Sequence, residues 1–153
     1  MKHLMTVALG LIAIALGSVQ ASAAVTAIKQ IENHTSSNVY VRSYEMSYGW
    51  IIPPDGRRYG VNMWIPWADN QDQFDNGSNP NQGPAHITIY DVNQSPLFSI
   101  FQSGNHVYYV IGEEYPADPA DRHFVGTDNG VGGDRELTVT DTDAGPQPSL
   151  IDL

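Results

Sequence analysis

The sequence predicts an all-β protein: a single antiparallel β-sandwich or open barrel of about eight short strands, preceded by a signal peptide. Three observations support this fold class. Short runs of alternating or β-branched residues recur along the chain, and Gly, Pro, Asn and Asp separate them. No long stretch of the mature chain shows the 3.6-residue hydrophobic period of a helix. The 153 residues suffice for one ordinary domain.

The segment 1–23 has the layout of a secretory signal peptide. A short basic region precedes the apolar run from Met5 to Leu16, and Ala21-Ser22-Ala23 places small residues before a cleavage site. The alternative, a membrane anchor, is disfavoured because a span needs about 20 apolar residues. We therefore expect a secreted or periplasmic protein whose mature chain has no transmembrane segment.

Four strands are predicted in the first half of the mature chain, at residues 25–31, 38–44, 48–52 and 59–65. The turn Pro53-Pro54-Asp55-Gly56 separates the last two, because Pro fixes φ and Gly accepts a positive φ. In the fourth strand, Val61, Met63 and Ile65 share one face. If that face is the core face, Trp64 points outward.

Two long loops divide the second half of the chain, at residues 66–84 and 112–133. The remaining predicted strands are 86–90, 97–102, 106–111 and 134–140, with a tight hairpin connection at 103–105. Residues 141–153 contain one Gly and two Pro and are predicted to be a flexible C-terminal tail. The β-sandwich domain is accordingly expected to span residues 24–140.

The charge and the cysteine count restrict the classes of function. The full chain has a formal charge of −10, and loss of Lys2 with the signal peptide makes it −11. So acidic a protein repels phosphate backbones, which argues against a nucleic-acid partner. The chain has no cysteine, which excludes disulfides and thiol catalysis.

An acidic loop offers a candidate metal site. Asp69, Asp72 and Asp75 recur at a spacing of three, and calcium prefers six to eight oxygen ligands from a flexible loop. The alternative is a solvated surface loop, because Asp and Asn favour turns in their own right. Calcium is the one cofactor that the sequence suggests, and it is optional.

An aromatic group offers a candidate ligand site. Tyr48, Trp50, Trp64 and Trp67 lie at the ends of two predicted strands that a turn joins. An outward indole beside acids and amides is typical of a sugar-binding platform, because the ring stacks on the apolar face of a sugar. The alternative is that Trp64 and Trp67 only cover the edge of the core.

The function predicted first is a secreted, non-catalytic module that binds a glycan or a lipid headgroup through these aromatic residues. The segment 60–67 and the acidic loop after it are similar in general organisation to small secreted β-sandwiches that bind sugars or lipids, a likeness of fold only. Two alternatives stay open: an exported hydrolase that uses loop carboxylates such as Asp72 and Glu113, and a structural or cell-surface interaction protein. No catalytic residue is assigned, because the chain has no known catalytic motif.

Overall fold

The protein is built from two β-sheets in the computed structural model, which describes residues 24–44, 46, 49–78, 81, 83–125 and 131–153. Within these residues neither sheet closes into a barrel, and the all-β class is confirmed. The described part of the chain has no helix of the length and apolarity that a membrane span requires. The predicted signal peptide, residues 1–23, lies outside the described residues.

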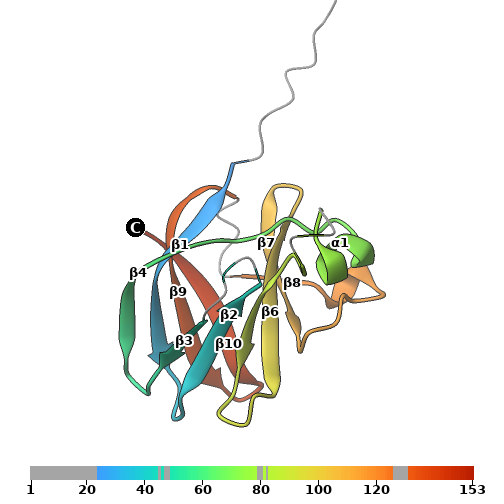
Figure 1. Ribbon diagram of the computed structural model, residues 1–153. Helices are drawn as coiled ribbons and strands as arrows, with labels where there is room; N and C mark the ends of the chain where they lie inside the picture. The colour runs from blue at the N-terminus through green and yellow to red at the C-terminus, as the bar shows by residue number, and fades with distance from the viewer. Residues whose placement is uncertain (1–23, 45, 47–48, 79–80, 82, 126–130) are drawn as a thin grey trace, which may run out of the picture.

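The two sheets lie face to face (Figure 1). The four-stranded sheet has the order β10-β9-β1-β4, and the six-stranded sheet has the order β3-β2-β5-β6-β7-β8. The first contains β1 (Thr26–His34), β4 (Arg57–Trp64), β9 (Gly133–Thr142) and β10 (Gly145–Asp152). The second contains β2 (Val39–Ser43), β3 (Gly49–Ile52), β5 (Ile87–Tyr90), β6 (Pro96–Ser103), β7 (His106–Ile111) and β8 (His123–Phe124).

The core between the sheets follows from the alternation of each strand. Apolar residues at every second position turn inward, except where a register shift between Ile28 and Gln30 of β1 adds one residue, and their removal from water is the main force that holds the sheets together. The four-stranded sheet contributes Ile28, Ile31, Val61, Met63, Leu137 and Val139, and the six-stranded sheet contributes Val39, Val41, Ile87, Ile89, Phe98 and Ile100. Val61, Met63 and Ile65 are buried whereas Trp64 is exposed, as the pattern of residues 59–65 predicts.

Two details of the predicted fold are wrong. The sheets are not wholly antiparallel, because β1 pairs with β9 in parallel, from Thr26 opposite Gly133 to His34 opposite Thr140. A parallel pair needs a long connection, and here the chain forms the whole six-stranded sheet before β9 returns beside β1.

The second wrong detail is the C-terminal tail. Residues 145–152 form β10, which pairs with β9 and places Leu150 opposite Leu137. Pro146 and Pro148 suggested a tail, but an edge strand accommodates proline where its missing N–H would face away from the sheet.

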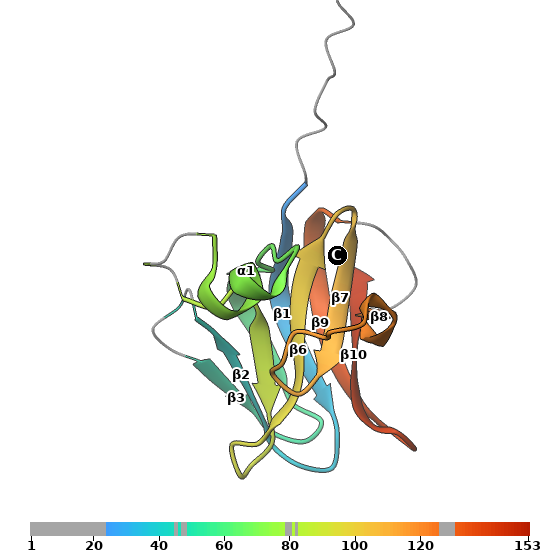
Figure 2. The ribbon, with the colours of Figure 1, turned by 90° about the vertical axis from the view of Figure 1, so that its right-hand side faces the viewer.

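The long loop between β4 and β5 contains a short helix that the sequence analysis did not predict, α1 (Gln71–Asn76). The side chain of Asn70 caps it by accepting a hydrogen bond of 3.0 Å from the Gln73 backbone N–H. The helix covers the outer face of the six-stranded sheet (Figure 2). Phe74 is its one buried residue, and its ring lies 5.3 Å from that of Phe101 on β6 and 5.5 Å from that of Tyr115. Tyr115 belongs to the loop that follows β7, so the two long loops meet on this face.

Candidate functional site

Trp64 and Trp67 line one groove. The groove has a volume of about 180 Å³, and Val25, Pro66 and Pro84 also contribute to its walls. The side chain of Trp64 is 60% exposed, whereas Trp67 is half-buried. The structure therefore brings together two of the four predicted ligand-binding aromatics and leaves one indole open to water.

The groove lies where the chain passes from one sheet to the other. At the end of β4 the Ile65 N–H donates to the Thr26 carbonyl at 3.0 Å, which holds the segment on the four-stranded sheet. Just beyond, the Gln102 N–H donates to the Pro66 carbonyl at 2.7 Å, and the Ala68 N–H donates to the Gln102 carbonyl at 2.9 Å. These bonds fix the backbone on both sides of Trp67, so the groove has a rigid floor that spans both sheets.

The opposite wall of the groove belongs to the loop that carries α1. Gly77 ends the helix with a φ of 75°, a conformation that favours glycine. The chain then returns to the sheet, where the Ala85 N–H donates to the Phe74 carbonyl at 2.9 Å. Apart from the indole N–H groups, Ser78 provides the one polar side chain among the described residues of the groove, and no charged side chain lines it. The groove is thus an apolar, aromatic concavity with polar character from the backbone.

Trp50, the third of the predicted aromatics, does not line this groove. Trp50 is 9% exposed and packs in the core between the sheets, because it shares the inward face of β3 with Ile52. A ligand-binding role for Trp50 therefore has no structural basis. Tyr48 lies outside the described residues.

The three aspartates of the acidic loop are not gathered around a common point. Asp69 accepts a hydrogen bond of 2.8 Å from the Ser103 hydroxyl, and Asp72 accepts one of 3.0 Å from the Asn76 amide within α1. Asp75 is exposed, as are the other two. Nowhere in the described residues do three His, Cys, Asp or Glu side chains lie close enough together to hold a metal ion. The expected calcium site thus gains no support, because Asp69 bonds to the hairpin after β6 whereas Asp72 bonds within α1.

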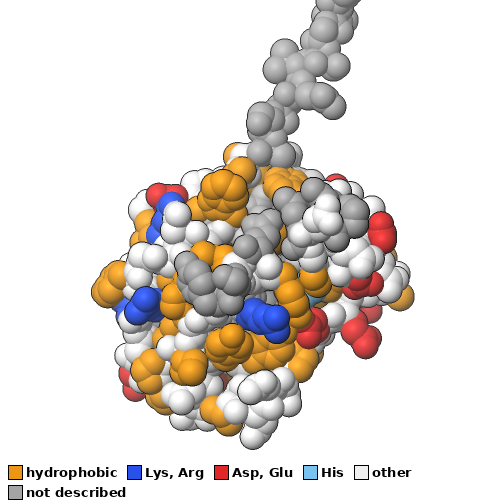
Figure 3. Space-filling model, in the orientation of Figure 1, with side chains coloured by type: hydrophobic (Ala, Val, Ile, Leu, Met, Phe, Trp, Pro, Cys, Tyr) orange, Lys and Arg blue, Asp and Glu red, His pale blue; other side chains and the backbone are white. Residues whose placement is uncertain are grey.

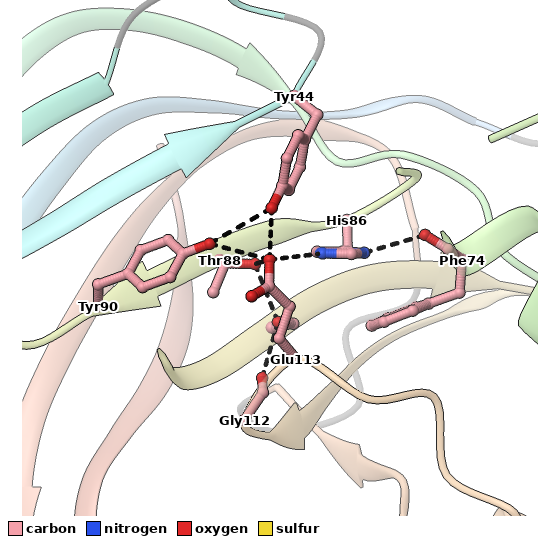
Figure 4. Close-up of polar contacts among 8 residues, drawn as sticks. Tyr44, Phe74, His86, Thr88, Tyr90, Gly112 and Glu113 are labelled. Carbon is pink, nitrogen blue, oxygen red and sulfur yellow. Dashed lines mark hydrogen bonds and ion pairs between the residues drawn. The ribbon is translucent and has the colours of Figure 1, made fainter. Parts of the chain in front are cut away.

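A polar cluster on the outer face of the six-stranded sheet was not anticipated (Figure 4). At its centre one carboxylate oxygen of Glu113 accepts a hydrogen bond of 2.6 Å from the Tyr44 hydroxyl and one of 2.9 Å from the Tyr90 hydroxyl. His86 Nε2 and the Thr88 hydroxyl each lie 3.5 Å from the same oxygen. The cluster fastens the loop after β7 to strands β2 and β5.

The pKa values in the cluster follow from burial and hydrogen bonding. Burial alone raises the pKa of Glu113, but hydrogen bonds from Tyr44 and Tyr90, and one from His86 when its ring is protonated, stabilise the carboxylate, and the net pKa lies below its ordinary value. Burial lowers the pKa of His86, and its bonds to Phe74 and Glu113 oppose that shift only in part. Burial and the hydrogen bond to Glu113 raise the pKa of Tyr44.

The backbone determines the tautomer of His86. Its Nδ1 lies 3.1 Å from the Phe74 carbonyl, which can only accept, so Nδ1 carries the hydrogen. In the neutral imidazole Nε2 is then unprotonated and faces the Glu113 carboxylate; in the protonated ring it donates to that carboxylate. His86 also stacks on the Phe74 ring at 4.1 Å. Its protonation state is thereby linked to the loop that carries α1.

The free energy of unfolding is expected to fall as the pH drops below about 6.5. A lowered pKa of His86 means that the unfolded chain binds more protons than the folded one below the ordinary value of 6.5. The lowered pKa of Glu113 adds a second loss of stability in the same direction below about 4.5. Urea denaturation at a series of pH values between 7.5 and 4 measures the slope of the free energy of unfolding against pH.

Two histidine variants distinguish the source of this pH dependence. His86→Leu is expected to flatten the slope between pH 7 and 5, whatever its effect on absolute stability, because it removes the titrating group. His123→Gln, which changes an exposed histidine, is expected to leave the slope as it is. A stability that rises as the pH falls from 7 to 5.5 would show instead that the ion pair of protonated His86 with Glu113 dominates.

The alternation of the predicted strands indicates part of this cluster. By alternation, Tyr44 shares one face of residues 38–44 with Tyr40 and Arg42, and His86, Thr88 and Tyr90 share one face of the predicted strand 86–90. The pairing of β2 with β5, which places Arg42 opposite Thr88, was not available from the sequence. Glu113 follows the end of β7 and has no strand pattern to orient it. The hydrolase alternative gains no support, because Asp72 bonds to Asn76 and Glu113 bonds to the tyrosines.

No protein-family model matches the chain, and no curated protein and no solved structure is significantly similar to it.

Proposed function

We propose that the protein is an exported, non-catalytic β-sandwich module that binds a neutral glycan in the groove between Trp64 and Trp67. The observation that carries this proposal is the exposed indole of Trp64 beside the half-buried indole of Trp67 on one apolar concavity. An indole in such a position stacks on the apolar face of a sugar ring while backbone groups and Ser78 bond its hydroxyls.

The charge of the protein supports a neutral ligand over an anionic one. The groove has no charged side chain among its described residues, so nothing there would pair with a phosphate, a sulfate or a uronic carboxylate. The mature chain carries 17 acidic residues, and its net negative charge repels anions at long range. A lipid phosphate headgroup is disfavoured for the same two reasons.

The size of the groove supports an extended ligand. At about 180 Å³ it is smaller than the roughly 300–1,000 Å³ of pockets that enclose a whole small molecule. A groove of this size accommodates one ring of an oligosaccharide chain whose other rings remain in water. The expected affinity is accordingly modest, because the buried area is small.

A glycan array tests the proposal. The folded mature protein, residues 24–153, is expected to bind a subset of neutral glycans and not their sulfated or sialylated counterparts. Binding is expected to persist in the presence of a chelator, since no metal site is assigned to the groove. Folded protein that binds no glycan on the array, or that prefers the charged ones, would overturn the proposal.

Export is also part of the proposal, and it is tested by the mass of the processed chain. When the full chain is produced in a Gram-negative host, we expect a protein outside the cytoplasm that begins at Ala24, because Ala21-Ser22-Ala23 supplies a cleavage site. The new N-terminus would lie next to Val25, which lines the groove. Recovery of the uncleaved chain from the cytoplasm alone would contradict this expectation.

A further inference from the structure

A second groove lies at the other end of the molecule from the Trp64 groove. It has a volume of about 350 Å³, and its lining includes Tyr40 and Arg42 of β2, Ile51 of β3 and Val92 of the turn before β6. That turn lies at the start of β6, which begins at Pro96. Trp67 of the first groove forms a β-bridge with Gln102, near the end of the same strand. The two grooves are therefore separate sites.

Arg42 gives this groove a positive charge that forms no ion pair with another described residue. The mature chain has six Lys and Arg residues, and three of them have carboxylate partners: Lys29 with Asp134, Arg57 with Glu32 and Arg135 with Asp152. The Arg42 guanidinium instead lies 4.6 Å from the centre of the Tyr44 ring and has no carboxylate partner in the described residues. In a protein this acidic, an arginine that lines a groove and has no ion-pair partner among the described residues is a candidate anion site.

The described lining of this groove contains one carboxylate, and it is not paired with Arg42. Asp91 also lines the groove, but no ion pair joins the two side chains. One Asp91 oxygen accepts hydrogen bonds of 2.8 Å from the backbone N–H groups of Asn93 and Ser95, so it holds the turn. Figure 3 shows most of the visible acidic side chains on the right, where α1 lies, with one of them directly beside the basic side chains at the centre.

The lining of the groove also includes the amides Asn38 and Gln94 and apolar side chains that are open to water. Ile51 is 69% exposed and Val92 is 59% exposed, and the half-buried ring of Tyr40 also lines the groove. Single exposed apolar residues are ordinary. Two of them in one groove, together with the guanidinium of Arg42, match a ligand that has one anionic group and an apolar part.

We propose that this groove binds a small monocarboxylate with an aliphatic tail. The carboxylate pairs with the guanidinium of Arg42, which presents N–H donors in a planar fork, and the tail lies on Ile51 and Val92. A single negative charge suits the site better than a multivalent phosphate, because the net charge of the protein opposes each further negative charge. The same repulsion disfavours an anionic membrane as the occupant.

Octanoate is a suitable probe, with octanol and acetate as matched controls that lack the charge or the tail. In ¹H–¹⁵N NMR titrations of the mature protein, octanoate is expected to shift the backbone resonances of Tyr40, Arg42 and Ile51. Arg42→Gln is expected to weaken octanoate binding by about tenfold or more, the effect of losing one charge-assisted pair. Arg58→Gln, which changes an exposed arginine on the four-stranded sheet, is expected to leave it unchanged.

Three outcomes would overturn this proposal: no octanoate binding, equal binding of octanol, or full affinity in the Arg42→Gln protein. Ile51→Ser gives an independent test, because it removes the apolar contact and keeps the charge, and it is also expected to weaken octanoate binding. The Trp64→Ala protein is expected to bind octanoate like the wild type. Failure of this site is thus distinguishable from failure of the glycan groove.

Discussion

Replacement of Trp64 by Ala is expected to weaken the binding of a neutral oligosaccharide roughly 10- to 150-fold. The expectation rests on the exposure of this indole. A sugar ring can stack on its exposed face, and the stacking removes water from both rings. Loss of one such buried contact reduces the binding free energy by about 1.5–3 kcal/mol, which corresponds to that range of weakened affinity. Isothermal titration calorimetry with the tightest neutral ligand from the array measures the change.

Tyr59 provides the matched control for Trp64. Both aromatics lie on β4 and both are exposed, but Tyr59 does not line the groove. Tyr59→Ala is therefore expected to bind the oligosaccharide like the wild type. Equal losses in the two variants, or no loss in Trp64→Ala, would show that the groove is not the binding site. Neither change removes a buried core residue, so both proteins are expected to fold.

Replacement of Phe74 by Ala is expected to lower the free energy of unfolding by about 3–5 kcal/mol, the range for deletion of a fully buried Phe side chain. Phe74 is wholly buried, stacks on His86 and contacts the rings of Phe101 and Tyr115. It fills the centre of a second apolar cluster, outside the main core, that joins both long loops to the sheet. Urea denaturation at pH 7.5 measures the loss.

Gln71→Ala is the matched control on the same helix. Gln71 is exposed in the first turn of α1, so its replacement is expected to change the free energy of unfolding by no more than about 0.5 kcal/mol. A loss below about 1 kcal/mol in Phe74→Ala would mean that the cavity collapses without cost, or that the second cluster is not a cooperative part of the fold. Because this loop forms one wall of the Trp64 groove, Phe74→Ala is also expected to weaken glycan binding.

Alternation predicted the parts of the fold that depend on local pattern. The inward positions Val61, Met63 and Ile65 and the outward Trp64 follow from a period of two, and burial of one face fixes that register. The helix α1 has no such signal, because six residues with one buried side chain are too few for a helical period. Its stability comes from the Asn70 cap and from the packing of Phe74, and the second of these is a tertiary contact.

The candidate site was predictable only where its residues are close in sequence. Trp64 and Trp67 are three positions apart, and the chain between them is held by backbone bonds to β1 and β6. The same proximity suggested a metal site at Asp69, Asp72 and Asp75, but carboxylates must also converge, and no three such side chains do so in the described residues. Arg42 and Val92 share a groove only because β2 pairs with β5, a register that one sequence does not specify.

The three tryptophans of the chain allow the most direct test of the central claim, that the Trp64 groove binds a glycan. Their indole N–H groups give three separate signals in a ¹H–¹⁵N NMR spectrum, which can be assigned by single replacement with Phe. On titration with the array-selected neutral oligosaccharide, the Trp64 and Trp67 signals are expected to shift together in a saturable manner, while the signal of the buried Trp50 stays in place. Three unmoved indole signals at a saturating ligand concentration would contradict the account.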